Sequence, residues 1–139
     1  RMQIQEEIKT FGLLGKALGT AFQIQDDILD YEALRLNTGK PALKDFKEGK
    51  VTFPLYFALQ HADAKDKNFI MSLLGQSKIL KKDQNKIYQL IQNEKTQKDI
   101  NSLLEKYTNE TLQHLNNLKH HACYNEMLDL ITFSTMRKI

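Results

Sequence analysis

Apolar residues recur with the period of a helix through the first part of the chain. From about Met2 to Leu34 they are spaced three and four positions apart, which places them on one face of a single long helix. A helix with one continuous apolar face is expected to bury that face against other helices. The positions on the predicted inner face are Ile4, Ile8, Phe11, Gly15, Leu18 and Phe22.

A loop and a second helix are expected next. Residues 36–50 break the helical period, and Thr52 followed by Pro54 has the pattern of a helix N-cap with proline in the first turn. We therefore expect a loop over residues 36–50 and a helix that runs to about Ala62. The turn-forming residues of the loop are Asn37, Gly39, Pro41 and Gly49.

Further helices are predicted in the rest of the chain. A short one is expected over Phe69–Leu74, ended near Gly75, and another over Ile79–Ile91. Thr96 and Asp99 form an approximate capping box, which predicts that a long amphipathic helix starts there. Its apolar face comprises Ile100, Leu104, Tyr107, Thr111, Leu115 and Leu118, and a last helix holds Met127, Leu128, Leu130, Ile131 and Phe133, with Arg137 and Lys138 at its C-terminal end.

Together these patterns favour an all-α fold. No stretch alternates polar and apolar residues for long enough to form a strand, and both prolines fall before residue 55. All six glycines lie at or before Gly75, so the remainder is expected to be a plain helical scaffold and any chemistry to lie in the first half. With 139 residues, 41% of them hydrophobic, one domain with a packed core is expected. Because Arg1 enters an already periodic pattern, we expect the interior or C-terminal part of a longer protein.

Composition argues against several classes of protein. The chain carries 20 Lys and Arg against 17 Asp and Glu, and these charges are interspersed, so no nucleic-acid partner is expected. The mean hydropathy is −0.50. The longest apolar run, Phe53–Leu59, is far shorter than the roughly 20 residues of a membrane span, so no span is expected. Cys123 is the single cysteine and cannot form an intrachain disulfide, which favours a reducing compartment, and the cytoplasm is the expected location.

An acidic cluster near the end of the first predicted helix is the most informative stretch. Asp26 and Asp30 are four positions apart and Asp27 and Asp30 three, so the three carboxylates share one face, with Gln23 one turn earlier. Like charges at this spacing repel, so the face either lies in water or binds a cation. Mg²⁺ would suit, because it takes oxygen ligands and is commonly held by one or two carboxylates plus substrate phosphates. For the cluster taken alone, a solvated acidic face remains the alternative.

A basic stretch follows the acidic one directly. Adjacent anionic and cationic clusters suit a metal-diphosphate substrate, because carboxylates hold the metal and lysines neutralise the remaining phosphate charge. Lys40 and Lys50 each follow a glycine in a turn, which lets their head groups project. The charged residues of this stretch are Arg35, Lys40, Lys44, Lys47 and Lys50, against Asp45 and Glu48.

The order and spacing of these residues resemble the second aspartate-rich motif and the lysine loop of trans-isoprenyl (polyprenyl) diphosphate synthases. The resemblance covers about Phe11 to Leu59 and implies an antiparallel helical bundle of the isoprenoid synthase type. This chain would form only its C-terminal half, with residues 1–139 as one part of a single prenyltransferase domain. The matching residues are Gly15, Gly19, Ala21, Phe22, Gln23, Asp26, Asp27 and Asp30, then Gly39, Lys40, Pro41, Asp45, Gly49, Lys50, Thr52 and Pro54.

The same resemblance implies an activity. The enzyme would condense an allylic diphosphate with isopentenyl diphosphate by Mg²⁺-assisted ionisation, to make a longer polyprenyl diphosphate, and would act as a homodimer. The opposite aspartate motif would lie on the N-terminal half, so the 139 residues alone are expected to be inactive. The implied metal ligands are Asp26, Asp27 and Asp30, the implied diphosphate-binding residues are Gln23, Lys40 and Lys50, and Asp26, Asp27 and Lys40 would be catalytic.

Three other readings of the sequence stay open. One is a non-catalytic helical partner subunit of such a synthase, and another is a helical scaffold or nucleic-acid binder. The third is a terpene cyclase, although its second metal motif usually contains Asn and Ser or Thr where this chain has Asp. His120, His121 and Cys123 resemble metal ligands in type, but adjacent histidines diverge on a helix, so structural or exposed roles are expected for them.

Overall fold

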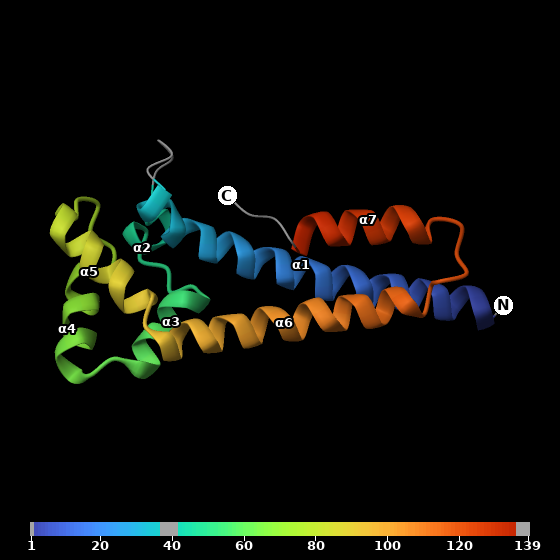
Figure 1. Ribbon diagram of the computed structural model, residues 1–139, viewed down its shortest axis with the longest axis horizontal. Coiled ribbons are helices and arrows are strands. Elements are labelled where there is room, and N and C mark those ends of the chain that lie inside the picture. The colour runs from blue at the N-terminus through green and yellow to red at the C-terminus, as the bar shows by residue number, and fades with distance from the viewer. Residues whose placement is uncertain (1, 37–41, 136–139) are drawn as a thin grey trace. The chain divides into compact units, whose positions relative to one another are not determined.

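The computed structural model describes residues 2–36 and 42–135, and within these ranges the protein consists of helices without strands (Figure 1). This confirms the predicted all-α class. The helices are α1 (Met2–Leu36), α2 (Lys44–Lys47), α3 (Phe53–His61), α4 (Ala64–Leu73), α5 (Lys81–Ile91), α6 (Glu94–Asn116) and α7 (Tyr124–Thr135).

Most predicted helices are confirmed within a few residues at their ends. The long first helix is continuous, and α3 follows Thr52 with Pro54 in its first turn. The short α2 lies within the stretch that was predicted to be a loop. Helix α4 begins earlier than the apolar pattern indicated, because the Asp63 carboxylate accepts a hydrogen bond from the Asp66 amide (2.8 Å) and caps a polar first turn. Arg137 and Lys138 lie outside the described residues.

The predicted capping box at Thr96 and Asp99 is wrong. Helix α6 already begins at Glu94, and the Asn93 side chain accepts a hydrogen bond from the Lys95 amide (2.9 Å) just before it. Thr96 is fully buried within the first turn, and Asp99 contacts His61 (2.6 Å). The two residues have the spacing of a capping box, but tertiary contacts hold them inside the helix.

The chain divides into two compact units. Unit 1 comprises Arg1–Gln25 and Leu103–Ile139, and unit 2 comprises Asp26–Ser102. Helices α1 and α6 each contribute residues to both units. No helix among the described residues is long and apolar enough to cross a membrane.

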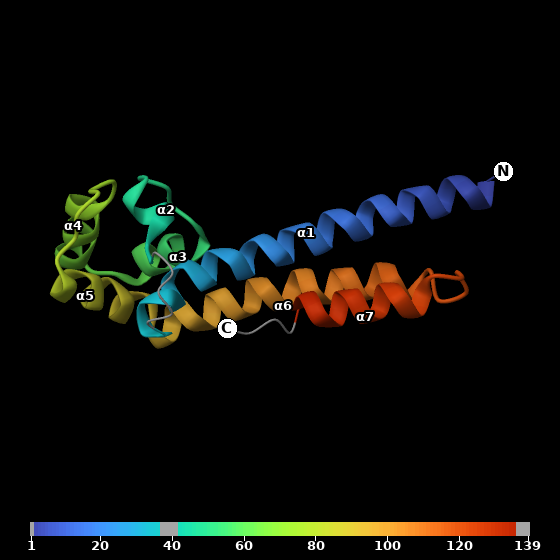
Figure 2. The same ribbon diagram turned by 90° about the horizontal axis from the view of Figure 1, so that it is seen from above.

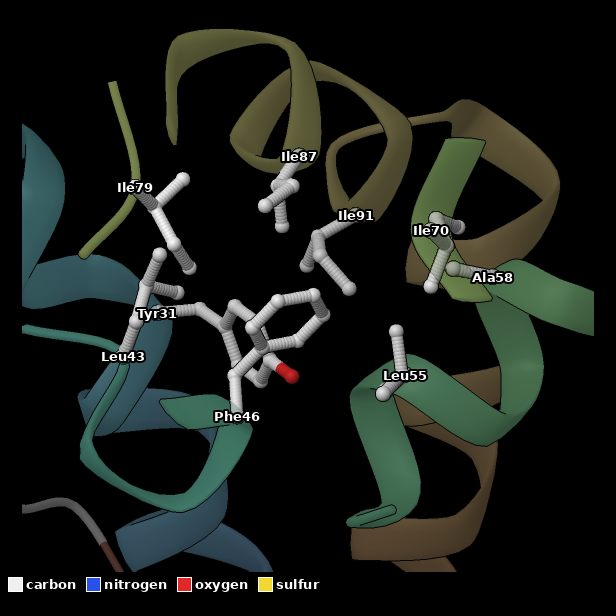
Figure 3. Close-up of a cluster of buried hydrophobic side chains, with 9 residues drawn as sticks. All are labelled: Tyr31, Leu43, Phe46, Leu55, Ala58, Ile70, Ile79, Ile87 and Ile91. Carbon is white, nitrogen blue, oxygen red and sulfur yellow. The ribbon is translucent and has the colours of Figure 1, made fainter. Parts of the chain in front are cut away.

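Unit 2 has a core to which α1, α2, α3, α4 and α5 each contribute side chains. Tyr31 of α1 and Phe46 of α2 point toward isoleucines of α4 and α5 and toward Leu55 of α3 (Figure 3). The side-chain amide of Gln92, just after α5, also donates a hydrogen bond to the Glu32 carboxylate of α1 (3.1 Å). The buried members of the core are Tyr31, Leu43, Phe46, Leu55, Ala58, Ile70, Ile79, Ile87 and Ile91.

Unit 1 has a smaller core formed where α1, α6 and α7 lie side by side (Figures 1 and 2). The His121 ring meets Phe11 edge to face at 5.3 Å and accepts a hydrogen bond from the Cys123 amide, which gives His121 a structural role. The buried residues of this core are Leu14, Leu115, Leu118 and Ile131.

The buried face of α1 differs from the predicted one. Ile4 and Ile8 are 56% and 67% exposed, whereas Leu14, Ala17 and Ala21 are buried. Small alanines let a neighbouring helix approach closely, so they can lie innermost although they contribute little to the apolar pattern. The larger isoleucines on the other stripe form an exposed apolar surface.

Candidate functional site

The three aspartates of the predicted acidic face lie on the part of α1 that belongs to unit 2. Asp26 is exposed, Asp30 is half-buried, and Asp27 is only 5% exposed. The three carboxylates therefore differ in environment although they share one helix. Gln23 is exposed on α1 one turn earlier, in the section that belongs to unit 1.

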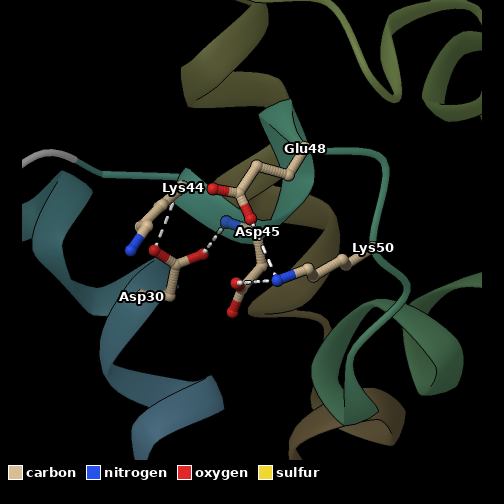
Figure 4. Close-up of polar contacts among 5 residues, drawn as sticks. All are labelled: Asp30, Lys44, Asp45, Glu48 and Lys50. Atoms are coloured by element: carbon tan, nitrogen blue, oxygen red, sulfur yellow. Dashed lines mark hydrogen bonds and ion pairs between the residues drawn. The ribbon is translucent and has the colours of Figure 1, made fainter.

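Asp30 binds the stretch that carries the lysines, which we call the lysine segment and define as residues 44–50. Its Oδ1 accepts a hydrogen bond from the Lys44 amide (3.0 Å) and its Oδ2 accepts one from the Asp45 amide (3.3 Å) (Figure 4). The Asp30 carbonyl also accepts from the Leu43 amide (3.3 Å). The acidic end of α1 and the lysine segment are thus joined in the fold by hydrogen bonds from the backbone of the segment to the Asp30 carboxylate.

Opposing effects act on the pKa of Asp30. Burial raises the pKa of Asp30, the two backbone hydrogen bonds from Lys44 and Asp45 lower it, and the nearby charges of Asp45 and Asp27 raise it further, with a net increase. The carboxylates of Asp27, Asp30 and Asp45 are therefore near enough to repel one another, and a cation bound here would relieve that repulsion.

Lys50 forms ion pairs with the two acidic residues of the lysine segment. Its Nζ lies 3.0 Å from a Glu48 carboxylate oxygen and 4.0 Å from one of Asp45 (Figure 4). The hydrogen bond from Lys50 lowers the pKa of Glu48, and the same contact raises the pKa of Lys50. The Lys50 side chain is 63% exposed, and an ion pair this exposed is weak enough to be exchanged for a phosphate.

Phe46 is a residue of the lysine segment that the sequence reasoning missed. It is fully buried in the core of unit 2, and its apolar side chain fixes an otherwise charged segment (Figure 3). The signal was available, because Phe46 is the one aromatic residue between Lys44 and Lys50. Lys40, predicted to contact the diphosphate, lies outside the described residues, as do Gly39 and Pro41.

The side chains of Tyr31 in α1 and Thr52 at the start of α3 lie close to each other. The Tyr31 ring is buried, and burial raises the pKa of its hydroxyl. The Thr52 hydroxyl lies near enough to oppose that increase, but neither hydroxyl reaches full hydrogen-bonding geometry. Thr52 does not cap α3 with its side chain either. The sequence pattern identified Thr52 as an N-cap but gave no indication of its proximity to Tyr31.

The fit of a metal ion can be judged from these positions. No group of three or more His, Cys, Asp or Glu side chains converges to a metal-binding arrangement within residues 2–36 and 42–135. The two oxygens of Asp30 are already engaged by amides, and Asp27 is nearly inaccessible. A divalent ion here would therefore take one or two carboxylates and complete its coordination with water and phosphate oxygens, which is the habit of Mg²⁺.

The described residues define the protein as an all-helical one whose aspartates and lysine segment lie in the same unit. The family model for polyprenyl synthetase matches residues 2–92, which include α1 to α5. The chain belongs to the polyprenyl synthetase family.

Individual relatives agree with this family. Over 70 residues the chain is 40% identical to the short chain isoprenyl diphosphate synthase of Methanothermobacter thermautotrophicus, an alignment that covers 50% of this chain and 22% of the relative. It is 44% identical over 62 residues to the octaprenyl diphosphate synthase of Haemophilus influenzae, covering 45% of this chain and 19% of the relative. These alignments span about a fifth of the length of each curated relative.

A solved structure extends the likeness beyond the matched sequence. The crystal structure of a decaprenyl diphosphate synthase from Rhodobacter capsulatus superimposes with a TM-score of 0.81 at 26% identity. The match covers 96% of this chain and 42% of the crystallised one. Helices α6 and α7, which the family model does not match, therefore also follow the isoprenoid synthase fold, and the predicted bundle type is confirmed.

Proposed function

We propose that this chain is part of a trans-polyprenyl diphosphate synthase that condenses an allylic diphosphate with isopentenyl diphosphate by Mg²⁺-assisted ionisation. The family membership and the names of the matched relatives support a prenyltransferase. A longer polyprenyl diphosphate would be the product.

One observation carries the proposal beyond family membership. The Asp30 carboxylate holds the Lys44 and Asp45 amides at 3.0 and 3.3 Å, so the acidic end of α1 and the lysine segment form one fixed assembly within unit 2. A diphosphate bound with a divalent cation needs anionic and cationic groups side by side. A solvated acidic face would need no such connection.

The carboxylates fit Mg²⁺ in type and charge. Asp26 is exposed and can ligate the ion directly. Asp27 and Asp30 are less exposed, and they would act on the ion directly or through a bound water. When bound, Mg²⁺ would stabilise the negative charge that develops on the departing diphosphate.

Lysines of the chain supply the remaining positive charge. Lys40 would contact the allylic diphosphate, and Lys50 would turn from Glu48 and Asp45 toward a phosphate oxygen. Fixed cations beside the leaving group stabilise the transition state more than the ground state, because the charge grows during ionisation. Gln23 would orient the substrate from the preceding turn of α1.

The assembly that we propose needs more than these residues. The matched crystal structure is a longer chain, of which this one covers 42%. We propose that residues 1–139 form the C-terminal part of a single domain, that the N-terminal half supplies the opposite aspartate motif, and that the complete enzyme is a cytoplasmic homodimer. The exposed Ile4 and Ile8 support this assembly, because they offer an apolar surface for further helices to cover.

Complementation tests the proposal. The chain is mixed or co-expressed with the N-terminal half of a related synthase and assayed for incorporation of labelled isopentenyl diphosphate into longer products, with and without EDTA. We expect Mg²⁺-dependent condensation from the pair and none from the chain alone. Condensation that persists when Asp26 and Asp27 are both replaced by alanine would instead favour the non-catalytic partner subunit.

A further inference from the structure

A turn far from the aspartates in sequence is bonded to the lysine segment. The Phe46 carbonyl accepts two hydrogen bonds, one from the Gly49 amide and one from the Gly75 amide, both at 3.0 Å. The first closes the turn at the end of α2. The second comes from the turn that follows α4, residues 74–76, which we call the Gly75 turn.

The amide of Gly75 is not used to end its own helix. A glycine after a helix commonly donates its amide hydrogen bond to a carbonyl in the last turn of that helix. Here the Leu74 amide donates to Ile70 and the Gln76 amide to Leu73, whereas the Gly75 amide donates to Phe46. The turn thus contributes its central donor to the lysine segment.

The backbone conformation of both glycines is what this contact requires. Gly49 and Gly75 have φ values of 81° and 86°, in the left-handed region that residues with a side chain avoid. A Cβ on either residue would lie 3.8 Å from the Cα of the other, an ordinary van der Waals distance. Space is therefore available for a methyl group, and the constraint at Gly75 is its left-handed backbone conformation, which sets the direction of its amide.

The lysine segment is consequently fixed from two sides. The Asp30 carboxylate accepts hydrogen bonds from the Lys44 and Asp45 amides, and the Gly75 amide donates one to the Phe46 carbonyl. The Lys50 amide in turn donates to the Asp45 carbonyl (2.9 Å). The position of the Lys50 backbone, from which its side chain projects, therefore depends on the contacts of both Asp30 and Gly75 with this segment.

We propose that the Gly75 turn positions the lysine segment for diphosphate binding, which makes Gly75 a positioning residue. The inference rests on the proposed function and adds to it a support that lies outside the aspartate and lysine motifs. All the residues that carry it belong to unit 2.

Three variants of the 139-residue chain test the proposal. Gly75→Ala disfavours the left-handed backbone while adding a single methyl group, and Gly75→Asn is the conservative replacement, because asparagine tolerates that region better than other residues with a side chain. Gly12→Ala is the matched control, since Gly12 lies in α1 of unit 1 with no atom within 4 Å of an added Cβ.

Two measurements are made on each variant at a temperature where circular dichroism shows full folding. Hydrogen exchange measures the exchange rates of the Lys44 and Asp45 amides. Calorimetry measures the dissociation constant of inorganic pyrophosphate in the presence of Mg²⁺. For Gly75→Ala we expect both the exchange rates and the dissociation constant to rise by roughly fivefold or more. We expect Gly75→Asn to recover most of the loss and Gly12→Ala to match the unaltered chain.

The outcomes separate this inference from the proposed function. Unchanged exchange in Gly75→Ala overturns the support by the turn, and faster exchange with an unchanged dissociation constant overturns its role in binding. Equal pyrophosphate affinity in all variants would leave the proposed function standing. If the unaltered chain binds no pyrophosphate with Mg²⁺ even when it is paired with the N-terminal half of a related synthase, the diphosphate site itself fails, and the positioning role fails with it.

Discussion

Units 1 and 2 are both helical, but they are held together by different kinds of contact. Unit 1 consists of long helices joined mainly through the apolar core of Leu14, Leu115, Leu118 and Ile131. Unit 2 adds polar contacts between residues distant in sequence. Those described above join Asp30 to the lysine segment, Phe46 to Gly75, Glu32 to Gln92 and His61 to Asp99.

This difference shows which part of the fold depends on contacts of defined direction. A packed pair of helices tolerates small shifts, because dispersion and apolar burial depend weakly on direction. A hydrogen bond weakens steeply when its angle changes, so contacts of this kind fix a loop in one position. Unit 2 has such contacts around the segment that carries Lys44 to Lys50, where the proposed chemistry needs charges at defined places.

The largest expected effect concerns the two cores. Phe46→Ala removes a fully buried ring from the core of unit 2 and should lower the free energy of unfolding by about 3–5 kcal/mol. Leu115→Ala in unit 1 should cost less, about 2–3 kcal/mol, because its smaller core has partly exposed neighbours that can relax. Urea titrations combined with hydrogen exchange in each unit would measure both. A larger loss for Leu115→Ala would reverse the comparison.

The next largest effect is a difference in turnover between alanine variants of acidic residues in the two units. In a complete synthase that contains this chain, Asp26→Ala or Asp27→Ala should lower turnover by on the order of 10² or more, comparable to the loss of one preorganised electrostatic element. Asp129→Ala, at an exposed position of α7 in unit 1, should leave turnover unchanged. Steady-state rates with a magnesium titration test this. Near-normal rates and unaltered magnesium dependence in both Asp26→Ala and Asp27→Ala would contradict the site.

A smaller effect should separate two lysines of the basic stretch. Lys40→Ala should raise the KM for the allylic diphosphate by roughly tenfold, the scale of one charge-assisted hydrogen bond. Lys44→Ala should change it little, because Lys44 contributes its backbone amide to Asp30 and alanine keeps that amide. Equal effects would indicate a diffuse basic surface in place of a specific contact.

The smallest expected effect is a change in the pH dependence of stability at Asp30. The folded protein holds the pKa of Asp30 above its usual value of 3.8, mainly through burial, so the folded state binds the proton more tightly than the unfolded chain does. This residue therefore favours folding at acid pH, and that contribution is lost as the pH rises from about 3.8 through the folded-state pKa.

Asp30→Asn removes the titration while keeping one acceptor oxygen for the Lys44 or Asp45 amide. Its unfolding free energy, measured in urea between pH 4 and 7, should fall less with rising pH than that of the unaltered chain. Asp129→Asn on the exposed surface of unit 1 serves as the control and should follow the unaltered profile. Identical pH profiles for Asp30→Asn and the unaltered chain would show that folding does not raise the pKa of Asp30.

The sequence by itself determined the class of fold and the positions of most helices. The period of three and four residues located α1, and the pair Thr52 and Pro54 located the start of α3. The aspartates and lysines with their spacing identified the family that the comparisons confirm. These are local or ordered features, since helical hydrogen bonds and capping act between residues a few positions apart.

Only the tertiary structure decided which side of each helix became buried and which distant segments came into contact. The strongest apolar stripe predicted Ile4 and Ile8 as inner residues, yet Ala17 and Ala21 lie inside because the depth of burial depends on how closely a neighbouring helix approaches. The spacing of Thr96 and Asp99 predicted a helix start, but Thr96 is buried and Asp99 contacts His61. Asp30 holding the lysine segment, and Gly75 donating to Phe46, follow from chain closure over long sequence separations. Such contacts leave no periodic trace in the sequence, because they depend on where two distant segments meet in space and on the direction of one amide.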